Sequence, residues 1–157
     1  MPVMNVNHIN PFLQCSISVM KSVTQIDLTV GHPEKTDFKL KNRMYAIQVG
    51  VVGEMRGQVV LAMEEKIALE VASRMMFGMQ VTEIDEMSAS ALNELSNMIM
   101  GNTATVFSTQ GILIDITPPI AICGDGIQMH SDIDGIRVPL LKDGVEYMSL
   151  YICIFKE

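Results

Sequence analysis

The chain has 157 residues, of which 48% are hydrophobic and 18% charged, a balance typical of a folded globular domain. Its formal net charge of −7 makes nucleic-acid binding unfavourable, because a phosphate backbone would repel the protein. No uninterrupted apolar run approaches the ~20 residues needed to cross a bilayer, so we expect no membrane insertion. The N-terminal M-P-V-M-N-V-N-H lacks the pattern of a signal peptide. Cys15, Cys123 and Cys153 lie far apart in apolar runs, as buried thiols of a reducing compartment do, so we expect a cytoplasmic protein.

The predicted elements follow one another without a linker. A helix is expected to begin at Asn10-Pro11 and to end near Val23, and the alternating residues 24–30 predict a strand. A polar loop is expected over 34–42. The later predicted elements are a hairpin (45–52 and 58–63), two helices (64–77 and 88–107) and four strands (112–116, 120–123, 136–141 and 147–155). Pro139 predicts that its strand lies at an edge or carries a bulge. This order predicts one α+β domain over residues 1–157, with a largely antiparallel sheet and two long helices packed on one face.

The helix predicted over 88–107 carries the strongest functional signal. Its apolar residues recur at helical spacing and form one stripe: Leu92, Leu95, Ile99 and Val106. The opposite stripe contains Ser90, Glu94, Asn97 and Gly101. A helix that buries the first stripe presents the second, so Glu94 and Asn97 stand side by side on an open face. Small neighbours such as Gly101 and Ala104 leave room for another protein, and Met87 and Met98 lie near the same face.

Other chemistries have little support in the sequence. The three histidines lie in polar or turn-like segments and no G-x-S-x-G is present, which disfavours a Ser-His-Asp hydrolase. Asp125, Asp132 and Asp134 do not match the spacing of a calcium loop, so we expect no metal site. Neither glycine-rich nucleotide motif, G-x-x-x-x-G-K-[ST] or G-x-G-x-x-G, occurs in the chain.

The chemistry of the remaining pair is restricted. A neutral carboxamide such as that of Asn97 is not a general base, but it holds a water molecule by accepting and donating hydrogen bonds. The neighbouring Glu94 can pair with a cation or help to orient the same water. Such a pair suits hydrolysis in which another molecule supplies the electrophile and its metal ion.

These residues resemble the CheC/CheX/FliY family of chemotaxis phosphatases, and its CheX branch in particular. The matching motif is Ser90-x-x-x-Glu94-x-x-Asn97, with a proline element downstream at Pro118-Pro119. The surrounding A-L-N-E-L-S-N-M-I-M-G-N, the early I-N-P-F-L and the G-Q-V-V-L-A-M segment extend the similarity over nearly the whole chain. Pro119 arrives one residue sooner than the family pattern places its proline.

The E-x-x-N pattern occurs once in this chain. The other helix has Glu70 and Ser73 in the corresponding places, which resembles the single-site CheX type rather than the doubled-site CheC type. The resemblance implies a CheC-like fold and hydrolysis of the phosphoaspartate on a CheY-like response regulator. The regulator would bring both the acyl phosphate and Mg²⁺, so the protein would need no cofactor of its own.

Family analogy also implies roles for individual residues. Asn97 would place the attacking water in line with phosphorus, and Glu94 would pair with the active-site lysine of the regulator. The remaining residues expected to contact the partner are Ser90, Met98, Gly101 and Pro119. Relatives of the CheX type are homodimers joined through their sheets, and the strand near Pro139 offers a possible edge. The alternative hypothesis is a non-catalytic adaptor that binds a regulator or a flagellar or receptor-associated protein through the same helix.

Overall fold

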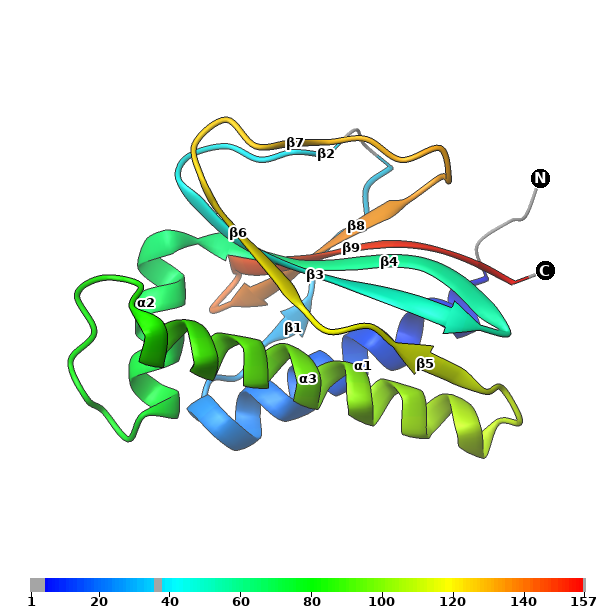
Figure 1. Cartoon of the computed structure of the whole chain (residues 1–157), viewed down its shortest axis with the longest axis horizontal. Coiled ribbons are helices and arrows are strands. Elements are labelled where there is room, and N and C mark those ends of the chain that lie inside the picture. Colours follow the sequence, from blue (N-terminus) through cyan, green and yellow to red (C-terminus); the bar gives the residue numbers. More distant parts are fainter. Residues whose placement is uncertain (1–4, 36–37, 157) are drawn as a thin grey trace.

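The computed structural model describes residues 5–35 and 38–156. Residues 1–4, which belong to the segment assessed for a signal peptide, and residues 36–37 of the predicted polar loop lie outside these ranges. Within the described residues, three helices cover one face of a seven-stranded sheet, and a small two-stranded ribbon lies over the other face (Figure 1). The sheet is antiparallel throughout, which confirms the predicted α+β class with helices on one face.

The helices are α1 (Val6–Thr24), α2 (Glu65–Met75) and α3 (Glu86–Thr109). The predicted start of the first helix at Asn10-Pro11 was wrong, because α1 begins earlier, after Asn5, whose side chain accepts a hydrogen bond from the Asn7 amide at 2.9 Å. Ile9 is 7% exposed and packs in the core. Its packing stabilises the first turn of α1, which comes before the predicted start. Pro11 lies inside the helix and is itself buried, and it removes only one backbone donor near the helix start.

The strands follow in the order β1-β8-β9-β4-β3-β5, and β6 also pairs with β3. Their bounds are β1 (Thr29–Val30), β2 (Phe38–Lys39), β3 (Met44–Gly53), β4 (Met55–Glu64), β5 (Ile114–Ile116), β6 (Ile120–Gly124), β7 (Gln128–Met129), β8 (Ile136–Lys142) and β9 (Val145–Lys156). The predicted hairpin is formed by β3 and β4. Its turn is tighter than expected, since pairing continues to Val51 opposite Gly57 and Met55 is fully buried.

The strand predicted over 24–30 is mostly absent as a strand. Ile26 and Leu28 are buried, as the alternation predicted, but only Thr29–Val30 pairs with a neighbour, β8. Of the two alternatives predicted for the strand of Pro139, the edge does not apply, because the Gly31 amide donates to the Pro139 carbonyl at 2.8 Å and β1 continues the pairing. The register does shift between Leu140 and Leu141, which confirms the predicted bulge.

Two apolar cores hold the layers together. The larger core lies between the helices and the sheet. The smaller one lies between the sheet and the β2–β7 ribbon, where Ile127 and Met129 pack against a cluster that includes Tyr151 and Cys153. The ribbon was not predicted, since each of its strands has two residues. Cys15 and Cys153 are buried as expected, but Cys123 is exposed, because β6 lies at the open end of the sheet and, among the described strands, has only β3 beside it.

Candidate functional site

The start of α3 is fixed by a reciprocal cap. The Ser88 amide donates to Oδ1 of the N-cap residue Asp85 at 2.8 Å, and the Asp85 amide donates to the Ser88 hydroxyl oxygen at 2.7 Å. The Ser88 amide and the Ser88 hydroxyl both donate to Oδ1 of Asp85, and these two bonds lower the pKa of the Asp85 carboxyl. Ser88 is fully buried, so the first turn of α3 is anchored against the rest of the fold.

The inward face of α3 follows the predicted periodicity with one correction. Leu92, Leu95 and Ile99 are buried to 2% exposure or less, as predicted. Val106 is only half-buried, and Phe107 is fully buried in its place. At this end of α3 the helix packs on α1, where the rings of Phe107 and Phe12 lie 5.6 Å apart. Because α1 packs on this end of α3, the buried face of α3 here is centred on Phe107 instead of Val106.

The outward face of α3 is open. We call Met87, Ser90, Glu94, Asn97 and Gly101 the outer stripe, since helical spacing places them on one side. Glu94 and Asn97 are both exposed. Across residues 5–35 and 38–156, neither side chain forms a hydrogen bond or an ion pair within the chain. The pair is thus available to another molecule, and the Glu94 carboxylate has no cationic side chain of the described chain beside it.

The other predicted contact residues divide into two groups. Ser90 is exposed and Gly101 half-buried, and a Cβ built on Gly101 meets nothing within 4 Å, so internal packing does not require glycine there. Met98, in contrast, is half-buried and packs on the main core. Pro119 is half-buried directly before β6, which runs beside α3 (Figure 1). The structure therefore brings Ser90 and Gly101 onto the same face as the pair, whereas Met98 turns toward the core and Pro119 lies on a separate segment before β6.

Comparison with known proteins identifies the family. The family model described as "Chemotaxis phosphatase CheX" matches residues 45–141. The chain belongs to the CheX family. A relative from Thermotoga maritima described as "CheY-P phosphatase CheX" is 25% identical over 151 residues, which cover 96% of this chain and 97% of the relative.

Solved structures agree with this family. A CheC-like superfamily protein from Shewanella sp. PV-4 is 30% identical and superposes with a TM-score of 0.84, covering 96% of this chain and 99% of its own. The CheX–CheY–BeF₃–Mg²⁺ complex from Borrelia burgdorferi contains a chain that is 27% identical, with a TM-score of 0.79 and coverage of 97% and 100%. These chains share the architecture of the present CheX-family protein over nearly its full length.

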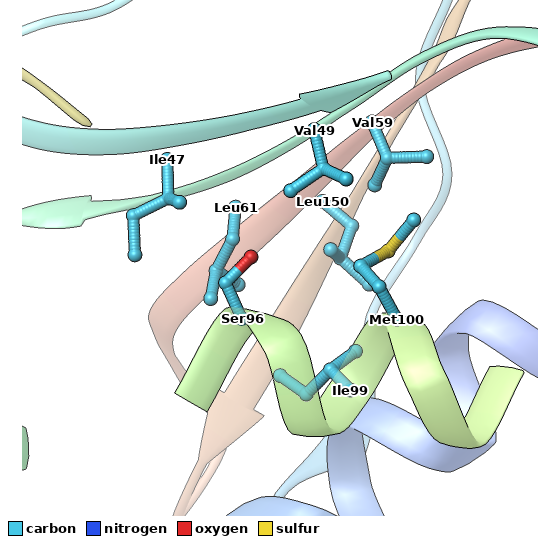
Figure 2. A pocket seen from close by; sticks show the side chains of 8 residues that line it. All are labelled: Ile47, Val49, Val59, Leu61, Ser96, Ile99, Met100 and Leu150. Carbon is cyan, nitrogen blue, oxygen red and sulfur yellow. The ribbon is translucent and has the colours of Figure 1, made fainter. Parts of the chain in front are cut away.

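A small void lies under α3, on the side away from the outer stripe. Its volume is about 10 Å³, and it is lined by Ile47, Val49, Val59, Leu61, Ser96, Ile99, Met100 and Leu150 (Figure 2). Organic ligands need cavities of roughly 300 Å³ or more, so this space is a packing gap and not a substrate pocket. Ser96 contributes the only polar side chain of its lining, which is too little to hold a buried water.

The described residues show no other assembled centre. Nowhere in these ranges do three or more His, Cys, Asp and Glu side chains gather as a metal site. In the same part of the chain, none of the helices combines the length and apolar character needed to span a membrane. The cap formed by Asp85 and Ser88 was not predicted, although D-x-x-S directly before the periodic segment is a recognisable helix-start signal.

Proposed function

We propose that this protein hydrolyses the phosphoaspartate of a CheY-like response regulator, using Asn97 to position water and Glu94 to dock. The observation that supports the proposal is the open pair on α3. Glu94 and Asn97 are exposed, lie one helical turn apart and have no partner among the described residues, in a chain that belongs to the CheX family.

The role of Asn97 follows from the chemistry of a carboxamide. Its oxygen accepts a hydrogen bond from the attacking water, while its amino group donates to a phosphoryl oxygen or to the same water. Water oxygen forms the new bond to phosphorus, and the bond between phosphorus and the aspartate oxygen breaks. The products are a free carboxylate and inorganic phosphate, which keeps both protons of the water as H₂PO₄⁻ or releases one of them to solvent. Phosphoryl transfer of this kind depends on in-line placement more than on a strong base.

The role of Glu94 is to hold the regulator in register. A carboxylate without an internal cation forms a charge-assisted hydrogen bond with a lysine of the partner, and such a bond both orients and attracts. The regulator supplies the acyl phosphate together with Mg²⁺, which neutralises charge on the phosphoryl oxygens. A complex of CheX, CheY, BeF₃ and Mg²⁺ exists for the Borrelia burgdorferi relative. It supports the proposal that a regulator brings the phosphoryl group and the metal ion to this protein.

The same proposal includes a homodimer formed through the β6 edge. The expected edge at Pro139 is covered by β1, whereas β6 pairs only with β3 among the described strands. Ile120 is 62% exposed and Ile122 is 37% exposed on this strand, which an edge-to-edge contact would cover. Sedimentation equilibrium of the purified chain measures the assembly directly. Three free cysteines fit a reducing compartment, so we place the protein in the cytoplasm.

The decisive experiment is phosphate release from a phosphorylated regulator at substoichiometric protein. We expect Asn97→Ala to lower the stimulated rate by at least about 100-fold while regulator binding remains, because only water placement is lost. Asn102→Ala is the matched control, since Asn102 is also an exposed asparagine on α3 but lies off the outer stripe. Unchanged stimulation by Asn97→Ala would reject the mechanism. Binding by the wild type without faster phosphate release would favour the adaptor alternative.

A further inference from the structure

The connection between α2 and α3 sorts its apolar side chains into two groups. Val81 and Ile84 pack against the main core and anchor the connection. Phe77 and Met79 point the other way, with exposed fractions of 101% and 53%. Single exposed apolar side chains are ordinary on protein surfaces, whereas several in one segment form a patch of the kind that marks contact sites.

The backbone at Phe77 shows that fold stability does not explain this residue. Phe77 has a φ of 59° and occupies the left-handed position after α2, and the Gly78 amide closes the helix end by donating to the Ser73 carbonyl at 2.9 Å. This position in helix ends is normally glycine, because a side chain there is strained. A fully exposed aromatic side chain gains no packing in return. Phe77 has a strained backbone and adds no packing to the folded state, which indicates that it contacts another molecule.

A third exposed apolar residue, Met87, belongs to the outer stripe itself. Met87 is 60% exposed and lies seven residues before Glu94, which places the two on the same side of α3. The connection itself extends beyond the N-terminal end of α3, where this side of the helix begins (Figure 1). We call Phe77, Met79 and Met87 the apolar tip. A molecule seated on Glu94 and Asn97 that extends toward the N-terminal end of α3 reaches Met87 and then the connection that carries Phe77 and Met79.

The charges around the apolar tip restrict its partner. The sequence contains no lysine or arginine from Met75 to Ile136. Glu83, Glu86 and Glu94 are exposed, and none of them forms an ion pair with another described residue. An anionic lipid surface would be repelled by these carboxylates, whereas a protein surface that combines lysine or arginine with apolar residues would be attracted. The partner proposed for Glu94 already presents a lysine.

We propose that the apolar tip is a second contact for the same response regulator, which packs apolar surface near its phosphorylation site on Phe77, Met79 and Met87. The inference rests on the proposed function, because it extends the surface on which the regulator docks. The tip sets affinity and plays no part in the chemistry. Aromatic and methionine side chains suit this task, since a few such residues supply most of the binding energy in small interfaces.

The test compares binding, turnover and stability in Phe77→Gly. We expect its affinity for a regulator loaded with BeF₃⁻ and Mg²⁺ to fall about tenfold, as loss of an aromatic contact does. Its KM in the phosphate-release assay rises in parallel, while kcat at saturating regulator is kept. Its thermal midpoint stays the same or rises, because glycine relieves the left-handed strain. A second variant, Met79→Gln with Met87→Gln, tests the same surface without changing that backbone position.

Leu113→Ala provides the matched control. Leu113 is 67% exposed but follows the opposite end of α3, about 36 Å of helix away, and should leave regulator affinity unchanged. Unchanged affinity in both tip variants, with an active wild type, overturns the inference and leaves the proposed function intact. The same holds if the variants lose self-association, or binding to vesicles of zwitterionic lipid, in place of regulator affinity. A wild type that neither binds the regulator nor speeds phosphate loss removes the proposed function and the inference with it.

Discussion

Helices α2 and α3 each present a glutamate followed three residues later by a polar side chain, and the two glutamates have different surroundings. On α2 the pair is Glu70 and Ser73, and on α3 it is Glu94 and Asn97. The Tyr147 hydroxyl donates to Oε1 of Glu70 at 2.8 Å. The Arg74 and Lys142 nitrogens lie 3.7 and 3.8 Å from the same oxygen. Glu94 forms no such contact with any described residue.

The difference arises from what lies beside each helix. Glu70 meets the β8–β9 hairpin, which brings Tyr147 and Lys142 to its carboxylate. The outer stripe of α3 has no comparable neighbour, and its first turn is held by its own cap. A carboxylate with three partners already contributes to the fold, whereas one without partners is available to another protein. The spacing E-x-x-polar is therefore uninformative until the neighbours of the glutamate are known.

The largest effect is expected when each of the two glutamates is replaced by glutamine. We expect Glu94→Gln to lower kcat/KM for the phosphorylated regulator by about 10- to 100-fold, because a charge-assisted hydrogen bond is weakened. Its thermal midpoint should not change, since Glu94 has no partner within the described chain. Glu70→Gln should behave in the opposite way, with a lower midpoint and normal turnover. Equal loss of turnover in the two variants would contradict the division of roles.

The contact between Tyr147 and Glu70 gives a smaller effect on stability. Tyr147→Phe should lower the free energy of unfolding by about 1 kcal/mol, because Glu70 loses a hydrogen-bond donor while its cations remain. Burial first, and then the hydrogen bond to Glu70, raise the pKa of Tyr147 above its ordinary 10.0. The neutral hydroxyl is thus favoured in the folded state. Its stabilisation is fully present below pH 10 and is lost as pH rises through the folded-state pKa.

Urea unfolding of the wild type and Tyr147→Phe across pH 8 to 11 measures both parts of this prediction. The gap between the two proteins should narrow above pH 10, where the ordinary tyrosine pKa lies. A constant gap over the whole range would show that the hydroxyl does not titrate differently in the two states. Phosphate release at neutral pH should be the same for both proteins, because α3 is untouched.

Much of the fold and of the candidate site is predictable from local sequence. The two stripes of α3 follow from periodicity within one helix, so the burial of Leu92, Leu95 and Ile99 and the exposure of Glu94 and Asn97 needed no knowledge of distant segments. The β3–β4 hairpin is equally local. Whether Glu94 and Asn97 have the roles assigned to them remains a prediction, since exposure alone does not test chemistry.

Three of the errors share one physical cause, which is dependence on segments far away in the sequence. Pro139 looks like an edge residue until Gly31, from more than a hundred positions earlier, pairs with its carbonyl. Val106 looks buried until Phe12 of α1 turns the face toward Phe107. Cys123 lies in an apolar run, yet its strand has one neighbour in the described part of the chain, and its thiol is exposed. Local patterns report what a segment prefers, and the assembled fold decides which preferences are met.

The smallest predicted effect is the most direct test of whether neighbours or spacing make the site. Ser73→Asn completes the pattern E-x-x-N on α2. We expect phosphate release to stay within about twofold of the wild type, as for most surface substitutions. The same substitution should not restore activity to Asn97→Ala, because the carboxylate of Glu70 is held by Tyr147, Arg74 and Lys142 and cannot reach a lysine of the regulator. If Ser73→Asn did restore turnover, spacing alone would be sufficient and the contrast between the two helices would fail.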